Sequence, residues 1–174
     1  MPASHYFVDL PTTALWGARL VPETHPIAEY FALCQVGALP RVVFLDPGFT
    51  TDLRTDDHPG GADTRAAQKF VADVFWAFAR SPHWQRGAFL VTYDEWGGFF
   101  DHVPPPILPD DRASSDDNEN FGQAGFRVPT ILASPYAQRG FVDHALYDHT
   151  SILRFIEWRF LGAPPTGPAV AAGS

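Results

Sequence analysis

One short segment, residues 91–106 (VTYDEWGGFFDHVPPP), carries the largest group of side chains suited to chemistry. Asp94 and Glu95 stand there at the end of an apolar run. In open α/β sheets ligands bind at the carboxyl ends of strands, and carboxylate oxygens are ligands that divalent cations prefer. This context favours a ligand site at Asp94 and Glu95, although an isolated Asp-Glu pair would do no more than end a strand.

Two glycines, at positions 97 and 98, follow these acids and allow the backbone to turn sharply. Asp101 and His102 come next. A reversal at the glycines would return a second acid, and a histidine able to act as base or ligand, to the same area. The simpler alternative is that Asp101 caps a turn.

A second polar loop, TDDHP at residues 55–59, precedes the longest predicted helix and contains Asp57 and His58. Unpaired N–H groups and the helix dipole at such a position can hold an anion. These residues by themselves do not distinguish an anion site from a plain turn and cap.

His149 lies in a third polar group, YDHTS at residues 147–151. Helix capping explains its neighbours Asp148, Thr150 and Ser151 without any function. His149 is therefore the residue there that could have another role, although a lone histidine is more often structural than catalytic. No neighbouring residues select a role for the remaining histidines that we considered, which are His5, His25, His83 and His144.

The elements that must position these residues follow an α/β pattern. Continuous apolar runs predict strands at 41–46, 88–93 and 128–134, and such runs suit a parallel sheet buried on both faces. Apolar residues three and four positions apart predict helices at 63–80, about 149–161 and, more weakly, 26–36. We expect an α/β layered domain with a largely parallel sheet and flanking helices.

Length and composition are consistent with one globular domain over residues 1–174. Residues 109–123 are acidic and polar and predict an exposed loop, and residues 162–174 form a proline-rich tail that cannot hold a helix. No apolar run reaches the roughly 18–20 residues of a membrane-spanning helix. The first residues also lack the pattern of a signal peptide, so the sequence indicates no compartment.

Charge and motifs exclude several classes of function. The formal net charge is −8, which argues against binding to a nucleic-acid backbone. Cys34 is the only cysteine, so an internal disulfide or a cysteine-rich zinc site cannot form. The sequence has no G-x-S-x-G elbow, no P-loop and no G-x-G-x-x-G fingerprint.

Five blocks, in this order and at these separations, resemble the C-terminal half of the bacterial phosphoesterase family, which includes non-haemolytic phospholipases C and acid phosphatases. The blocks are LPRVVFLDPGF, TDDHPGG, SPHWQRGAFLVTYDEWGGFFDHVPPP, GFRVPTILASPYAQRGFV and YDHTSILRFIEWRF. The resemblance covers nearly the whole chain, from about His5 to Leu161.

The resemblance implies a partial alkaline-phosphatase-like fold and metal-assisted hydrolysis of phosphate esters through a covalent phospho-enzyme. By the family's pattern Asp94 and Glu95 match ligands of a divalent metal ion. The pair Asp57 and His58 matches motif positions near the phosphate. Asp101, His102 and His149 also match the family's site motifs, without a defined role for each.

Family members are longer, and their first half supplies a Glu-Asn ligand pair and a Ser or Thr nucleophile. Neither is found in these 174 residues, since Glu119-Asn120 lies in the acidic loop and lacks the Ser-Phe-Asp that follows the pair in the family. We expect a phosphate-ester or phospholipid substrate, with the missing N-terminal half or a second copy as partner. The alternative is a non-catalytic remnant that binds an ion or a partner.

Overall fold

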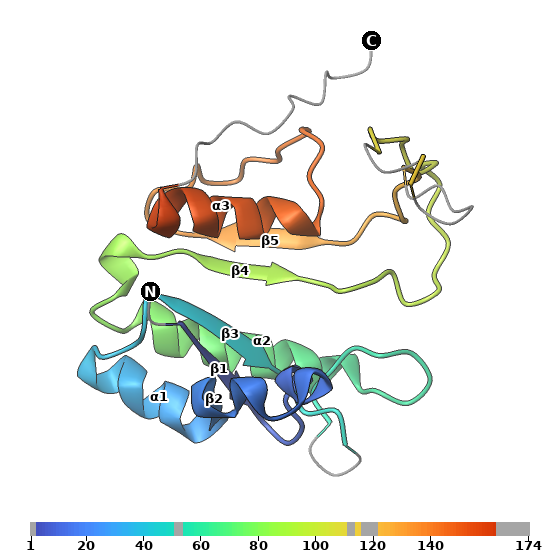
Figure 1. Ribbon diagram of the computed structural model, residues 1–174. Coiled ribbons are helices and arrows are strands. Elements are labelled where there is room, and N and C mark those ends of the chain that lie inside the picture. Colours follow the sequence, from blue (N-terminus) through green and yellow to red (C-terminus); the bar gives the residue numbers. More distant parts are fainter. Residues whose placement is uncertain (1–2, 51–53, 111–113, 116–121, 163–174) are drawn as a thin grey trace. The chain divides into compact units, whose positions relative to one another are not determined.

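The computed structural model describes residues 3–50, 54–110, 114–115 and 122–162 (Figure 1). The chain divides into two compact units. The first unit comprises Met1–Leu90 and Leu132–Gln138, and the second comprises Val91–Ile131 and Arg139–Ser174. Most of the tail, at 163–174, and much of the acidic loop, including Glu119 and Asn120, lie outside the described residues.

The first unit is built on a parallel sheet with the strand order β2-β1-β3. Its strands are β1 (Ala3–Phe7), β2 (Thr24–Pro26) and β3 (Val42–Asp46), and β1 pairs with both neighbours. Between β1 and β2 the chain forms a 3-10 segment, η1 (Thr12–Glu23). The expected α/β class with a parallel sheet and flanking helices is confirmed.

Two helices accompany this sheet, α1 (Ile27–Val36) and α2 (Thr64–Ala79). Four side chains, each only 2% exposed, form the core between these elements: Tyr6, Tyr30, Cys34 and Val74. The Tyr30 hydroxyl donates a hydrogen bond to the Val74 carbonyl at 2.8 Å, so α1 and α2 are joined by a polar contact inside an apolar core. The single cysteine is a small apolar core residue here.

The sheet also contains an Asp–His pair in which the aspartate is buried and the histidine partly buried. His5 Nε2 on β1 lies 2.5 Å from Asp46 Oδ2 on β3, and Asp46 is 7% exposed. The same carboxylate accepts the backbone N–H of Thr12 at 2.6 Å. His5, to which the sequence assigns no role, therefore helps to fix the start of η1 to the sheet.

The remaining strands, β4 (Phe89–Thr92) and β5 (Thr130–Ala133), form a two-stranded sheet. A short 3-10 turn, η2 (Trp84–Arg86), precedes β4. The hydroxyls of Thr92 and Thr130 lie 2.9 Å apart, so the end of β4 faces the start of β5 and the two strands run in opposite directions. All three predicted strands exist, but β3 pairs with β1 and not with β4.

The last helix, α3 (His149–Leu161), begins where the sequence predicts and belongs to the second unit. Asp148 and Ser151 form a reciprocal capping box, in which each side chain accepts the other's backbone N–H. The helix ends at Gly162, which has a positive φ of 71°. No residue of α3 is buried among the described residues.

Candidate functional site

The turn after β4 presents the predicted carboxylates. β4 ends at Thr92, and Asp94 and Glu95 follow on an exposed turn. Glu95 accepts the backbone N–H of Gly97 at 2.8 Å, which fixes that carboxylate over the turn. Gly97 and Gly98 have φ of 70° and 77°, so the sharp turn predicted at the two glycines is present and requires their positive φ.

His149 contacts Tyr93 at the start of the same turn, although 56 residues separate the two in the sequence. Its ring Nε2 lies 2.7 Å from the carbonyl oxygen of Tyr93. A carbonyl only accepts, so Nε2 carries the proton and the other ring nitrogen, Nδ1, is left for a second interaction. The second unit therefore places His149 beside the residue that precedes Asp94.

Asp101 is occupied by structural contacts. Arg127 donates to both of its oxygens, from Nε to Oδ2 at 2.8 Å and from Nη2 to Oδ1 at 2.7 Å. Oδ1 also accepts the backbone N–H of Val103 at 3.1 Å. The hydrogen bonds from Arg127, followed by that from Val103, hold the pKa of Asp101 well below its ordinary range. Asp101 is therefore a permanent anion at neutral pH and is not suited to donate a proton.

His102 projects to solvent beside this pair. Its side chain is 83% exposed, and Nδ1 lies 3.7 Å from Asp101 Oδ1, beyond hydrogen-bond distance. The structure thus brings Asp101 and His102 near each other only as chain neighbours. Arg127, and not His102, is the main partner of Asp101.

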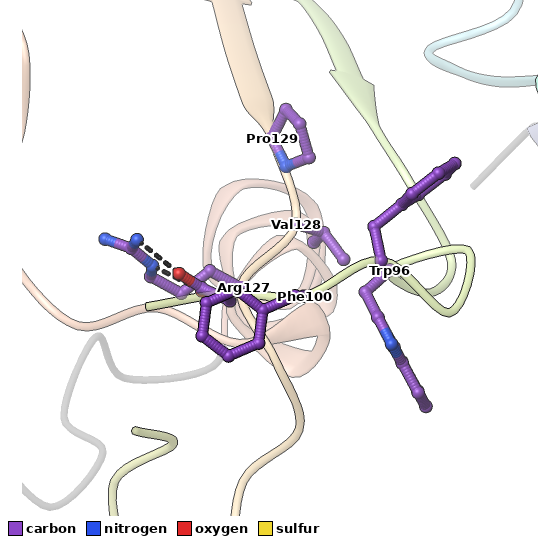
Figure 2. Close-up of a pocket in the computed structure, with 7 residues that line it drawn as sticks. Trp96, Phe100, Arg127, Val128 and Pro129 are labelled. Carbon is purple, nitrogen blue, oxygen red and sulfur yellow. Dashed lines mark hydrogen bonds and ion pairs between the residues drawn. The ribbon is translucent and has the colours of Figure 1, made fainter. Parts of the chain in front are cut away.

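A hollow of about 410 Å³ lies beside the Asp101–Arg127 pair in the second unit (Figure 2). Its other lining residues are apolar or aromatic: Trp96, Phe99, Phe100, Val128 and Pro129. Figure 2 shows Trp96 and Phe100 on the loop after β4, whereas Val128 and Pro129 lie on the segment that enters β5. The loop after β4 and the segment that enters β5 therefore form the hollow together.

The DDHP loop is organised around Asp56. Asp56 is 7% exposed and pairs with Arg54, whose Nε donates to Oδ1 at 2.9 Å. Asp56 Oδ2 accepts the backbone N–H of His58 at 3.2 Å, while the His58 ring is exposed with Nδ1 3.1 Å from the Pro59 carbonyl. Asp57 is partly buried. This loop belongs to the first unit, whereas the turn after β4 belongs to the second.

The start of α2 is already capped from within the chain. Asp63 accepts the backbone N–H of Arg65 at 3.0 Å and forms an ion pair with the Arg65 side chain. The hydrogen bonds from Arg65 lower the pKa of Asp63, so a negative charge already occupies the helix N-terminus. An anion at this helix N-terminus would thus compete with Asp63 for the N–H groups.

A divalent metal ion needs more ligands than the described residues bring together. Asp94 and Glu95 supply hard oxygen donors of the right chemistry. Within the part of the chain that the structure describes, however, no three His, Cys, Asp or Glu side chains are grouped as a metal site. The described residues therefore do not form a complete metal centre.

Two arginines near the site residues were not predicted, Arg54 and Arg127. With 12 Lys and Arg in the whole chain, an arginine close to an acidic motif is an informative signal. Arg54 lies two residues before Asp56 and could have been found from that spacing. Arg127 is 26 residues from Asp101, and no local pattern indicates that these two residues pair.

A membrane-spanning helix is not found in the part of the chain that the structure describes.

The chain matches the model of the phosphoesterase family over residues 5–161.

Curated relatives match the chain as well. It is 35% identical over 168 residues to non-specific phospholipase C1 of Arabidopsis thaliana, which covers 84% of this chain and 31% of the relative. It is 32% identical over 157 residues to phospholipase C B of Mycobacterium tuberculosis, which covers 83% of this chain and 29% of the relative. To the non-hemolytic phospholipase C of Burkholderia pseudomallei it is 40% identical over 107 residues, covering 52% of this chain and 15% of that protein.

The chain thus spans less than a third of the length of these relatives. The family match, by contrast, contains every site residue discussed above, from Arg54 to His149. The chain belongs to the phosphoesterase family.

Proposed function

We propose that this chain supplies part of the active site of a metal-assisted phosphate-ester hydrolase. The substrate would be a phospholipase C-like phosphodiester or an acid-phosphatase-like phosphomonoester. The observation that carries the proposal is the placement of His149 against the Tyr93 carbonyl, at the turn that bears Asp94 and Glu95. Family membership and the phospholipase C relatives support this chemistry.

In this proposal Asp94 and Glu95 contribute two carboxylate ligands to a divalent metal ion. When bound, such an ion would polarise a phosphoryl oxygen and lower the pKa of a hydroxyl nucleophile. Within the turn, Gly97 holds the Glu95 carboxylate in place and His149 leaves Nδ1 for a contact with substrate or water. Asp57 and His58 would act near the phosphate, with Asp56 fixing the His58 backbone.

Asp101 and His102 belong to the same proposed site and have different roles in it. Asp101 would act through Arg127 as a fixed anion, while the exposed ring of His102 would be accessible to substrate. The nucleophile and the remaining metal ligands would come from a segment outside this chain. The share of the relatives' length that the chain spans supports a partner of this kind.

Two experiments test the proposal. The first titrates Mn²⁺ into the purified chain by calorimetry, with Asp94→Asn and Glu95→Gln as variants and Asp110→Asn as a control. We expect weak binding that either site variant abolishes and the control retains. Equal binding by all four proteins would show that Asp94 and Glu95 are not ligands.

The second experiment supplies the rest of the site. The chain is expressed behind the preceding segment of the M. tuberculosis relative and assayed with a chromogenic phosphate ester. We expect hydrolysis that a chelator stops and that Asp94→Asn or Glu95→Gln lowers by more than about a hundredfold. Normal turnover in both variants would overturn the proposal.

The alternative is a non-catalytic domain that binds an ion or a second polypeptide. The lack of a three-ligand group among the described residues favours it, as does α3, none of whose side chains is buried. Chelator-sensitive hydrolysis by the 174-residue chain alone would exclude this alternative.

A further inference from the structure

The loop that carries His58 is tied to the end of β3 by a reciprocal pair of hydrogen bonds. Thr55 donates its backbone N–H to the Gly48 carbonyl at 2.8 Å. The Thr55 hydroxyl accepts the Gly48 N–H, also at 2.8 Å. Gly48 lies two residues beyond the last residue of β3, so Arg54 and Asp56, the neighbours of Thr55, are held near the carboxyl end of a parallel strand. Ligands of open α/β sheets bind at such ends.

The Arg54 guanidinium and the Asp56 carboxylate together hold both polar groups of the His58 backbone. Arg54 donates from Nε to Asp56 Oδ1 at 2.9 Å and from Nη2 to Oδ2 at 3.3 Å. Nη2 also donates to the His58 carbonyl at 3.3 Å. Asp56 Oδ2 accepts the His58 N–H at 3.2 Å. The His58 backbone therefore cannot turn without breaking a bond to this pair.

The pair is shielded from water in a way that an ordinary surface ion pair is not. The side chain of Arg54 is 27% exposed and that of Asp56 is 7% exposed. Burial raises the pKa of Asp56, but hydrogen bonds from the Arg54 side chain and the His58 N–H outweigh burial and lower it, so Asp56 is an anion at neutral pH. Bidentate guanidinium–carboxylate bonds also fix direction. The similar pair of Arg65 with Asp63 is far more open, at 88% and 52% exposed.

The His58 ring extends from this support with one of its nitrogens already engaged. Nδ1 lies 3.1 Å from the Pro59 carbonyl oxygen. Because a carbonyl only accepts, Nδ1 carries the proton of the neutral ring and Nε2 keeps an available lone pair. The residue is exposed, and within the described ranges no hydrogen bond is made by Nε2. His58 therefore offers an incoming molecule a hydrogen-bond acceptor of fixed direction.

We propose that Arg54 is the positioning residue of His58, and that it holds the ring so that Nε2 accepts a hydrogen bond from a hydroxyl group or a water molecule at the phosphate. The inference rests on the proposed function, in which His58 acts near the phosphate. It assigns a role to Arg54 and a tautomer to His58. An acceptor nitrogen would repel the lone pairs of a phosphoryl oxygen, so the neutral ring is matched to an O–H group and not to the phosphate itself.

Nuclear magnetic resonance of the purified chain tests the inference without any turnover. The chain is labelled with ¹⁵N-histidine and studied at a pH where the ring is neutral, since ¹⁵N shifts distinguish a protonated ring nitrogen from a bare one. The His58 signal is the one that His58→Gln lacks. We expect His58 to be mainly in the Nδ1–H form. A ring that is mainly in the Nε2–H form would overturn the proposal.

Variants of the two arginines show whether Arg54 selects this tautomer. We expect Arg54→Gln to shift His58 toward the Nε2–H form and Arg54→Lys, which keeps the charge but not the fork, to shift it less. Arg65→Gln is the matched control, because Arg65 also binds, through Nε and Nη2, an aspartate two residues away but does not contact His58. Should Arg54→Gln fail to fold, Arg54→Lys alone decides. The same tautomer ratio in the natural chain and in the folded Arg54 variants would contradict the assignment.

Kinetics of the chain joined to the preceding segment of the M. tuberculosis relative separates positioning from general support of the fold. We expect Arg54→Gln to lower kcat about tenfold or more with KM changed less than about twofold, and Arg54→Lys to recover part of the loss. In a His58→Gln background, Arg54→Gln should cause no further loss, because it acts through His58. Independent, multiplying losses would overturn the inference.

The outcomes distinguish this inference from the proposed function. The expected tautomer, with its dependence on Arg54, in a joined protein that does not hydrolyse the ester would overturn the proposed function alone. Chelator-sensitive hydrolysis that Arg54→Gln leaves at full rate would overturn the inference about Arg54 alone.

Discussion

Arg127 holds Asp101 through two parallel hydrogen bonds across 26 residues of chain, at 2.8 Å and 2.7 Å. The pair joins the loop after β4 to the segment that enters β5. It also stabilises the ionised form of Asp101, whose pKa lies below its ordinary value of 3.8. The contribution of this pair to stability is therefore complete at neutral pH and is lost when acid protonates Asp101 well below that value.

The first prediction concerns this pair. Asp101→Asn removes one ionic partner and weakens the contact with the Val103 N–H, so the loop opens more often. We expect the Val103 amide to exchange its hydrogen about five- to tenfold faster at pH 7, as measured by NMR. Asp73→Asn is the control, because its ion pair with Lys69 is a solvent-exposed pair within one helix and contributes little. Unchanged exchange at Val103 would show that the pair does not hold the loop.

A second prediction concerns the pH dependence of stability through Asp9. Burial raises the pKa of this carboxyl, but hydrogen bonds from the Thr50 hydroxyl and from backbone N–H groups outweigh burial and lower it to about 2. The folded pKa is below the unfolded one, so Asp9 stabilises the fold above about pH 4 and this contribution is lost as the pH falls toward 2.

Asp9→Asn should therefore lower the free energy of unfolding at pH 7 by about 1 kcal/mol, after allowance for solvent screening. The difference from the natural chain should shrink steadily between pH 4 and about pH 2. Urea unfolding at several pH values measures it, with Glu23→Gln, an exposed carboxylate of the same unit, as control. A difference that stays constant over this range would contradict the prediction.

The third prediction concerns the contact between His149 and Tyr93. His149→Ala removes the donor to the Tyr93 carbonyl but leaves the capping box of α3 intact. We expect a loss of about 1 kcal/mol in unfolding free energy. In the chain joined to the preceding segment of the M. tuberculosis relative, we expect His149→Ala to lower kcat more than His149→Gln does. The reason is that glutamine can still donate a hydrogen bond to the Tyr93 carbonyl. Equal kcat values in the two variants would show that orientation by Tyr93 is not what matters at His149.

A fourth prediction tests the core of the first unit. Tyr30→Phe removes the hydroxyl that donates to Val74 and leaves a buried carbonyl without that donor. We expect a loss of about 1–2 kcal/mol in unfolding free energy with no change in far-ultraviolet circular dichroism. Phe31→Leu, a partly buried position on the same helix, is the comparison for a change in packing alone. A neutral effect of Tyr30→Phe would mean that water replaces the hydroxyl.

The capping box of α3 gives a fifth prediction. Asp148→Ala removes the acceptor for the Ser151 N–H and should cost about 1 kcal/mol, whereas Asp148→Asn keeps a capping side chain and should cost less. Thermal unfolding measures both variants. If the two variants are equally stable, the cap at Asp148 does not act through its side-chain oxygen.

Local features were predictable because local interactions decide them. The range 149–161 and its cap at Asp148 agree with α3 as the structure has it, and the range 63–80 matches α2 together with its cap residues. Apolar spacing, capping side chains and stop signals all lie within a few residues of the element that they define. The three apolar runs likewise correspond to β3, β4 and β5.

β1 and β2 were not predicted, for a physical reason. β2 has three residues and β1 has five, and neither has a long apolar run. They are strands because β3, about 40 residues farther along, supplies hydrogen-bonding partners for β1. Pairing of this kind depends on the packing of the whole unit and leaves little trace in the local pattern.

The sequence by itself therefore determined the chemical types at the site, the family, and the elements that carry Asp94, Glu95, His58 and His149. Only the tertiary structure decided which of them meet. It paired Asp101 with Arg127, set His149 on the Tyr93 carbonyl and lined a hollow with Phe100. Residue types and their local spacing can be read directly from the sequence. The contacts of Asp101 with Arg127 and of His149 with Tyr93 span 26 and 56 residues, so they depend on how the strands and turns pack together.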